Sequence, residues 1–136
     1  MWGPNKKPKQ TAHIDSLIGQ NTEIHGDVIF SGGLHVDGTV KGSVIAEKGE
    51  DSVLTLSERG TIEGEVKVPN VVVNGSVIGD VHATGHVELA AHARVHGNVY
   101  YSLIEMAMGA EVNGKLMHQQ AEDNNPSVED DTQEEA

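Results

Sequence analysis

Apolar and polar residues alternate around a glycine in six short segments of this chain. The segments read EIHGDV (23–28), TVKGSV (39–44), TIEGEV (61–66), SVIGDV (76–81), RVHGNV (94–99) and EVNGKL (111–116). In every copy the residues two before and two after the glycine are aliphatic. This alternation predicts short β-strands in which positions i, i+2 and i+4 share one face, with the glycine at the middle inward position.

The six copies recur at a nearly constant interval, since their glycines are 15 to 22 residues apart. A period of this length is typical of a solenoid. A second apolar column stands eight residues before each glycine, at Ile18, Leu34, Leu56, Val71, Leu89 and Met106. A third stands four residues after, at Phe30, Ala46, Val68, Ala83, Tyr101 and His118, where the polar last member indicates the end of the regular coil. The pattern predicts an all-β protein, a three-faced parallel β-helix of about six coils.

Composition divides the chain into three parts. We expect a disordered basic N-terminal tail over 1–13, the β-helix over 14–118, and a disordered acidic C-terminal tail over 119–136, which has seven acidic residues and no basic one. The longest interval between glycines contains EKGEDS (47–52), which predicts a polar loop at one corner of the stack. Aromatic residues make up only 3% of the chain, so branched aliphatic side chains must fill the core.

Several classes of function are disfavoured by the same composition. The chain has no cysteine, and therefore neither a disulfide framework nor a thiolate metal site. Its first residues lack the apolar run of a signal peptide, and nowhere do eighteen apolar residues follow one another. A net charge of −12 with so few aromatics argues against nucleic acid as a partner. GQNTEIHG (19–26) lacks the lysine of a phosphate-binding loop, which argues against a nucleotide site. No cofactor is expected.

The two ends of such a stack predict its function. The first and last coils leave backbone edges unpaired and apolar side chains uncovered, and the flanking segments contain no apolar lid. We therefore expect each chain to bind other copies of itself end to end, in a head-to-tail filament or in one with head-to-head and tail-to-tail joints. The predicted contact residues are Ile24, Val28 and Phe30 in the first coil and Val112, Leu116 and Met117 in the last. The alternative is that Trp2, Ile14 or Leu17 folds back over one end.

The segment LIGQNTEIHGDVIFSGGLHVDGTVKGSVIA (17–46), the repeated V-x-G-x-V units and GAEVNGKL (109–116) resemble the bactofilins. The resemblance covers roughly residues 14–118. Bactofilins are bacterial polymer-forming cytoskeletal proteins, and the resemblance implies a right-handed β-helix and filament assembly without nucleotide. It also implies a membrane-associated scaffold that localises cell-wall synthases or hydrolases and contributes to cell shape.

Members of this family often carry a short N-terminal segment that targets the membrane, and MWGPNKKPK (1–9) has suitable chemistry. Trp2, beside Met1, prefers the headgroup interface, and Lys6, Lys7 and Lys9 are attracted to the anionic lipids of the inner membrane. A filament that presents many copies of a weak anchor gains avidity. The alternative is a soluble tail with an incidental tryptophan.

Two alternative interpretations of the sequence are an enzyme and a metal-binding protein. The recurrence of apolar residues every sixth position from Val71 to Tyr101 suggests a left-handed β-helix of the hexapeptide acyltransferase kind, but no trimerising segment or histidine base is identifiable. The pairs His82/His86 and His92/His96 have a spacing that brings two ligands together on a helix, which this chain is not predicted to form. We therefore predict neither catalytic nor metal-ligating residues.

Overall fold

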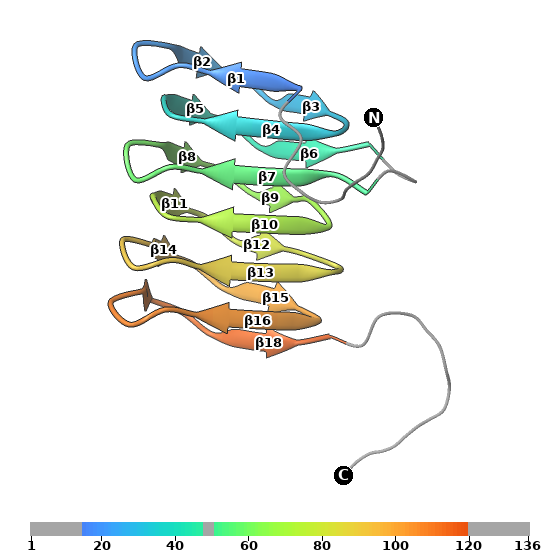
Figure 1. Cartoon of the computed structure of the whole chain (residues 1–136), viewed down its shortest axis with the longest axis vertical. Coiled ribbons are helices and arrows are strands. Elements are labelled where there is room, and N and C mark those ends of the chain that lie inside the picture. The colour runs from blue at the N-terminus through green and yellow to red at the C-terminus, as the bar shows by residue number, and fades with distance from the viewer. Residues whose placement is uncertain (1–14, 48–50, 120–136) are drawn as a thin grey trace, which may run out of the picture.

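The computed structural model describes residues 15–47 and 51–119, and the chain there winds as a stack of six coils (Figure 1). Each coil contributes one strand to each of three parallel, six-stranded sheets. The prediction of an all-β, three-faced solenoid of about six coils is confirmed. The predicted N-terminal tail, 1–13, lies outside the described residues, and so does the predicted C-terminal tail apart from Gln119. Ile14 of the predicted core and 48–50 of the predicted corner loop also lie outside them.

The eighteen strands repeat in the order sheet 1, sheet 2, sheet 3. Sheet 1 contains β1 (Ser16–Ile18), β4 (Gly33–Val36), β7 (Val53–Leu56), β10 (Asn70–Val73), β13 (His86–Leu89) and β16 (Leu103–Met106). Sheet 2 contains β2 (Glu23–His25), β5 (Thr39–Lys41), β8 (Thr61–Glu63), β11 (Ser76–Ile78), β14 (Arg94–His96) and β17 (Glu111–Val112). Sheet 3 contains β3 (Val28–Phe30), β6 (Val44–Ala46), β9 (Val66–Lys67), β12 (Val81–His82), β15 (Val99–Tyr101) and β18 (Leu116–His118).

The coil is right-handed. In Figure 1 the strands of sheet 1 lie nearer the viewer and run leftward, those of the other sheets lie behind and run rightward, and the chain descends with each coil. This is the hand that parallel strand connections almost always adopt. The left-handed coil required by the acyltransferase alternative is therefore not the fold of this chain.

Inward side chains form continuous columns along the axis of the stack. In sheet 2 the column runs through Ile24, Val40, Ile62, Val77, Val95 and Val112, as the sequence pattern predicted. Its middle members are fully buried, because each side chain packs between equivalent ones above and below. The core thus consists of stacked, thin layers of aliphatic side chains, which explains why few large aromatic residues are needed to fill it.

The six repeated glycines do not occupy the middle of a strand, and this prediction was wrong. Each lies at the corner where a sheet 2 strand ends and a sheet 3 strand begins, as Gly79 does between β11 and β12. A Cβ atom on Gly42, Gly64, Gly79, Gly97 or Gly114 would lie 2.0 to 2.2 Å from the carbonyl oxygen of the glycine one coil earlier. The flanking valines still point inward, because the chain bends around the core at the glycine.

The corner between sheets 1 and 2 has two lengths. Four residues connect the strands in coils 1, 3, 5 and 6, and each of these turns closes with a backbone hydrogen bond, such as that from the Gly60 N–H to the Ser57 carbonyl (2.9 Å). Only two residues, Asp37–Gly38 and Asn74–Gly75, connect them in coils 2 and 4. Leu34 and Val71 are therefore two residues out of the predicted register: Leu34 pairs with Ser16 and Leu54, whereas Val36 stands in the column of Ile18. All of these positions point inward, so the prediction erred in register and not in face.

Candidate polymerisation interface

The C-terminal end of the stack presents an unfinished layer of core side chains. Met106 in β16 is in register with Leu89, and Leu116 in β18 is in register with Val99. Leu89 and Val99 are completely buried, whereas Met106 is 46% and Leu116 43% exposed. The columns that fill the core therefore continue to this face, where no further coil covers them among the described residues.

Three other residues complete this C-terminal face. Ile104 continues the column of Val87, and Val112 continues that of Val95; both are half-buried and pack against the core. His118 continues the column of Tyr101, and its ring lies 5.5 Å from the Tyr101 ring, measured between centroids. The face is thus apolar except for one imidazole.

The N-terminal end is more nearly closed. Ile18 and Phe30 are each only 8% exposed, while Ile24 and Val28 are half-buried. Phe30, at the inward position in register with Ala46, supplies the bulk that the small alanine below it leaves unfilled. The exposed apolar area that favours association is therefore concentrated at the C-terminal face.

Strand edges accompany both faces. β1, β2 and β3 pair on one side only, with coil 2, and β16, β17 and β18 pair on one side only, with coil 5. Such edges hold backbone donors and acceptors that another strand can satisfy. Two chains that meet at these ends could therefore continue the three sheets as well as the core.

The structure places the sequence-predicted contact residues in different settings. Ile24, Val28, Val112 and Leu116 are inward residues of the first or last coil with part of their surface uncovered. Phe30 is also inward but buried within its own chain. Met117 is 41% exposed, but it pairs with Tyr100 in the outward column of sheet 3, so it lies on the lateral wall. Leu17, considered as a lid, is 62% exposed and pairs with the half-buried outward His35; Trp2 and Ile14 lie outside the described residues.

The contact residues predicted from the sequence do not include Ile104 and Met106, which the structure places on the C-terminal face. The signal was present, because Met106 was recognised as the last member of an apolar column. A residue that ends an inward column must lie on the terminal face of the stack, and this inference holds equally for His118.

Charged residues lie beside the end faces, on the outer wall of sheet 2. Near the N-terminal end, Lys41 Nζ lies 3.2 Å from Glu23 Oε2, and His25 Nε2 lies 2.9 Å from the same oxygen. The hydrogen bond from Lys41 lowers the pKa of the Glu23 carboxyl, and the same bond raises the pKa of Lys41. Near the C-terminal end, Arg94 Nε lies 3.6 Å from Glu111 Oε1. These exposed pairs lie on the outer wall of sheet 2 and not among the inward residues of the end faces.

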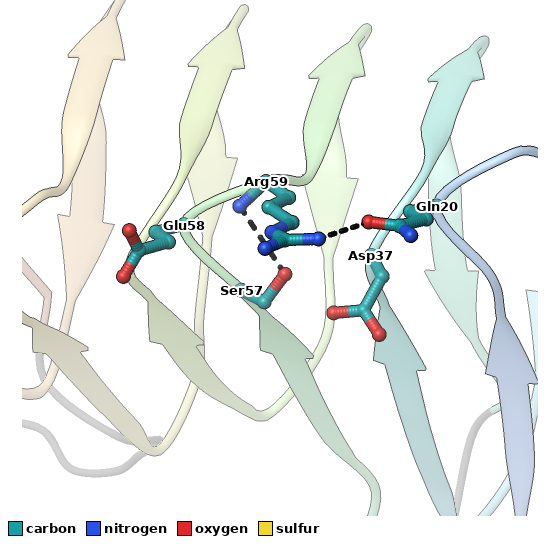
Figure 2. A pocket seen from close by; sticks show the side chains of 5 residues that line it. All are labelled: Gln20, Asp37, Ser57, Glu58 and Arg59. Carbon is teal, nitrogen blue, oxygen red and sulfur yellow. Dashed lines mark hydrogen bonds between the residues drawn. The ribbon is translucent and has the colours of Figure 1, made fainter.

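An open depression at the corner between sheets 1 and 2 is lined by Gln20, Asp37, Ser57, Glu58 and Arg59 (Figure 2). Arg59 reaches across from coil 3 and donates a hydrogen bond to the side-chain oxygen of Gln20 in coil 1. The contact joins coils 1 and 3 along the outside of the stack. It identifies the depression as a place where long polar side chains bind one another across coils.

Asp37 in this depression contacts a serine and a histidine, but not in a catalytic order. Its carboxylate lies 3.0 Å from His35 Nε2, and a hydrogen bond from Ser57 is the main cause of its lowered pKa. In a Ser-His-Asp triad the imidazole stands between the serine and the carboxylate and removes the serine proton. Here the carboxylate stands in the middle, an arrangement suited to holding the corner together.

The residues predicted to sit on solvated outer walls do so. His25 and His96 belong to one outward column of sheet 2 with Lys41, Glu63 and Ile78. His82 lies in sheet 3 and His86 in sheet 1, so the spacing that suggested this pair on a helix has no such meaning here. In the described part of the chain, no helix is long and apolar enough to cross a membrane.

The right-handed stack is a β-solenoid whose terminal strands are paired on one side only and whose C-terminal face is apolar. Residues 16–117 match the family model of the bactofilins, described as polymer-forming cytoskeletal proteins. The chain belongs to the bactofilin family.

Two bactofilins of Myxococcus xanthus (strain DK1622) are similar to this chain. BacO is 29% identical over 108 residues, which cover 79% of this chain and 82% of BacO. BacP is 31% identical over 98 residues, which cover 71% of this chain but only 41% of BacP. No solved structure matches the chain.

Proposed function

We propose that this protein polymerises end to end, without nucleotide, through the faces of its β-helix, and that the unfinished layer formed by Met106 and Leu116 is the main contact. Each of these side chains is more than two-fifths exposed, although Leu89 and Val99, the residues in register with them one coil earlier, are completely buried. Covering them removes apolar surface from water, which is the dominant favourable term in protein association. Family membership supports assembly, and the geometry supports the choice of face.

Negative-stain microscopy of the purified chain without nucleotide tests this proposal. We expect filaments from the unaltered protein and only short species from Leu116→Arg, because the joint would bury an unpaired charge. Leu103→Arg is the matched control: Leu103 is 67% exposed in the same coil, but it pairs with His86 in an outward column and should tolerate the charge. Discrete globular particles from the unaltered protein would overturn the proposal, and filaments from Leu116→Arg would assign the joint to another surface.

In the cell, we propose a scaffold at the inner face of the cytoplasmic membrane. The β-helix, over 14–118, would form the filament, with a basic N-terminal tail and an acidic C-terminal one on either side of it. Met1, Trp2, Lys6, Lys7 and Lys9, which lie outside the described residues, would bind anionic lipids. Each chain would bind weakly, so binding would depend on the many tails of a filament. The tryptophan and the three lysines in the sequence of the N-terminal tail support this role.

Flotation with anionic liposomes tests membrane binding separately from assembly. Filaments of the unaltered chain should float, and Trp2→Ala filaments of the same length should remain at the bottom. Leu116→Arg should also float poorly, because it retains the anchor but loses avidity. Equal flotation of Trp2→Ala and the unaltered chain would remove the tryptophan anchor from the proposal and leave polymerisation untouched.

The function proposed for the assembled filament is recruitment rather than catalysis. The family is cytoskeletal, and the Ser57–Asp37–His35 arrangement has the wrong order for a nucleophilic triad. We propose cell-wall synthases or hydrolases as the recruited enzymes and a contribution to cell shape as the result. Co-purification of such an enzyme with the unaltered chain, and its loss with Leu116→Arg, would support recruitment by the filament; equal recovery with both would assign binding to the single chain.

A further inference from the structure

The corner between sheets 2 and 3 carries a ladder of side-chain hydrogen bonds. One residue follows each corner glycine, and the backbone N–H at this position donates to the side chain one coil earlier at four of the five steps. The bonds run from Ser43 N to Asp27 Oδ1 (2.9 Å), Glu65 N to Ser43 Oγ (3.4 Å), Asn98 N to Asp80 Oδ1 (2.9 Å) and Lys115 N to Asn98 Oδ1 (3.0 Å). These bonds join neighbouring coils without forming a cavity.

The ladder is interrupted at Glu65. Within the described residues, the Glu65 carboxylate accepts no hydrogen bond from the Asp80 N–H, although Asp80 follows it in the ladder. Its oxygen Oε1 lies 3.5 Å from Lys67 Nζ on the outer wall of sheet 3. The longer side chain thus brings a carboxylate out of the corner and onto the wall.

This carboxylate meets two further ligand groups from the next coil. One donor atom each from Glu65, Asp80 and His82 lie within 4.8 Å of one another. Asp80 follows the corner glycine of coil 4, and His82, in β12, pairs directly with Lys67 of coil 3. Two acidic groups at this distance repel each other, and the nearby Lys67 compensates for only one charge.

Two of the three groups are already held in place. The His82 ring stacks on the Tyr100 ring, with centroids 4.5 Å apart and planes inclined by 5°. Stacking covers the faces of an imidazole but leaves its nitrogens accessible in the ring plane, where a metal binds. Asp80 Oδ1 accepts the Asn98 N–H, which fixes its carboxyl group while the other oxygen can ligate.

We propose that Glu65, Asp80 and His82 form a binding site for a divalent transition-metal ion such as Zn²⁺, which would link coil 3 to coil 4. One imidazole nitrogen and two carboxylate oxygens are a donor set that such ions accept. Ligands at about 2.1 Å from a tetrahedral zinc lie about 3.4 Å apart, so ligand atoms that now lie within 4.8 Å of one another must approach by up to about 1.4 Å. The exposed Glu65 can make this movement by rotating about its side-chain bonds.

Lys67 gives the proposal a distinctive prediction. Its ammonium group competes with the metal for Glu65, so its removal should strengthen metal binding, whereas removal of a ligand should weaken it. The opposite signs matter because a misfolded variant could lose binding but would not gain it.

Equilibrium dialysis of the untagged full chain against Zn²⁺ tests the site. We expect one saturable zinc ion per chain, an affinity at least tenfold lower for His82→Gln or Glu65→Gln, and a severalfold higher affinity for Lys67→Gln. His96→Gln is the matched control, because His96 is an exposed wall histidine of sheet 2 outside the cluster, and it should bind as the unaltered chain does. Zinc should also raise the melting temperature of the unaltered chain but not that of His82→Gln.

Two outcomes would overturn the site. One is the absence of saturable zinc binding by the unaltered chain and by Lys67→Gln. The other is an equal loss of affinity in His96→Gln and His82→Gln, which would indicate adventitious binding to surface histidines only. Neither outcome bears on end-to-end polymerisation.

Discussion

A Cβ atom on Gly79 would lie 2.2 Å from the carbonyl oxygen of Gly64, one coil earlier in the stack. Gly79 also has a φ of 147°, a backbone angle that residues with a side chain rarely adopt. At Gly79 the corner between sheets 2 and 3 therefore requires glycine for both space and backbone conformation. Gly26, in the first coil, has a similar φ of 136° but nothing within 4 Å of its would-be Cβ atom.

Comparison of these two glycines distinguishes the cost of backbone strain from the cost of a steric clash with the neighbouring coil. Both Gly79→Ala and Gly26→Ala should incur backbone strain of about 1–3 kcal/mol, but only Gly79→Ala should incur a further overpacking cost of about 1–3 kcal/mol. Thermal unfolding followed by circular dichroism, in the Leu116→Arg background so that assembly does not contribute, measures the difference. Equal melting temperatures for the two variants would show that the coils can move apart at this corner to accept the Cβ atom without a loss of stability.

Phe30 and Leu116 should respond differently to truncation. Phe30→Ala removes a side chain buried within its own chain, so it should lower the free energy of unfolding by up to about 3 kcal/mol. Leu116→Ala removes a half-exposed side chain and should leave this free energy nearly unchanged, but it should raise the protein concentration needed for filaments. Chemical unfolding of each truncation, compared with sedimentation of the assembled protein, distinguishes the two effects. A stable Phe30→Ala chain that fails to assemble would instead place Phe30 in the joint.

Ser52 is the one buried polar residue of the described core, with no exposed surface. Its hydroxyl oxygen accepts a hydrogen bond from the Gly32 N–H at 3.2 Å. Ser52→Ala should lower the free energy of unfolding by about 1–2 kcal/mol, because it leaves this donor without its partner in a place that water reaches poorly. Ser43→Ala is the control: its oxygen also accepts a backbone N–H, that of Glu65 at 3.4 Å, but on the exposed wall, where water can replace it. Similar losses in both variants would contradict the role of burial.

Asp37 should make the stability of the stack sensitive to acid. Its carboxyl pKa is lowered, first by the hydrogen bond from Ser57, so its contribution is present above the ordinary pKa of an aspartate. The contribution is lost as the pH falls through the lowered value, when the carboxylate takes up a proton. Asp37→Asn should therefore reduce the melting temperature at pH 6, and this reduction should become smaller as the pH falls below the ordinary pKa of an aspartate.

The serine provides an internal check on this prediction. In a Ser57→Ala background, the effect of Asp37→Asn at pH 6 should be smaller, because the main cause of the lowered pKa is absent. A constant effect of Asp37→Asn between pH 3 and pH 6 would show that the carboxyl charge does not stabilise the fold.

The sequence predicted the three faces and the inward columns because a stack of equivalent coils imposes the same burial on every copy. The sequence could not show that the glycine lies at a corner. Two inward aliphatic residues flank the glycine whether the chain continues straight through it or bends there. Stacking of Gly79 on Gly64 is a contact between coils, and no pattern within one copy reveals it. The two-residue corners at Asp37–Gly38 and Asn74–Gly75 shifted the register for a similar reason, because alignment on the glycines assumed corners of one length.

The candidate interface was predicted only in part. Apolar character led to Phe30 and Met117, but exposure at an end depends on which way a side chain points and on what lies beneath it. Phe30 is buried within its own chain, in register with Ala46, whereas Met117 lies on the lateral wall, in register with Tyr100. The proximity of Glu65 to His82 was beyond prediction, since it depends on the register between two coils.

The tolerance of the sheet 1–2 corner for either two or four residues offers a practical route to labelling this protein. The corner faces sideways, away from both ends, and at 90–93 its middle residues, Ala91 and His92, are exposed. A small fluorescent or affinity tag placed between these two residues would extend from the flank of the rod. Both chain termini and both terminal coils would keep their native sequence, so the tagged protein could report on assembly in living cells without occupying the surfaces that assemble.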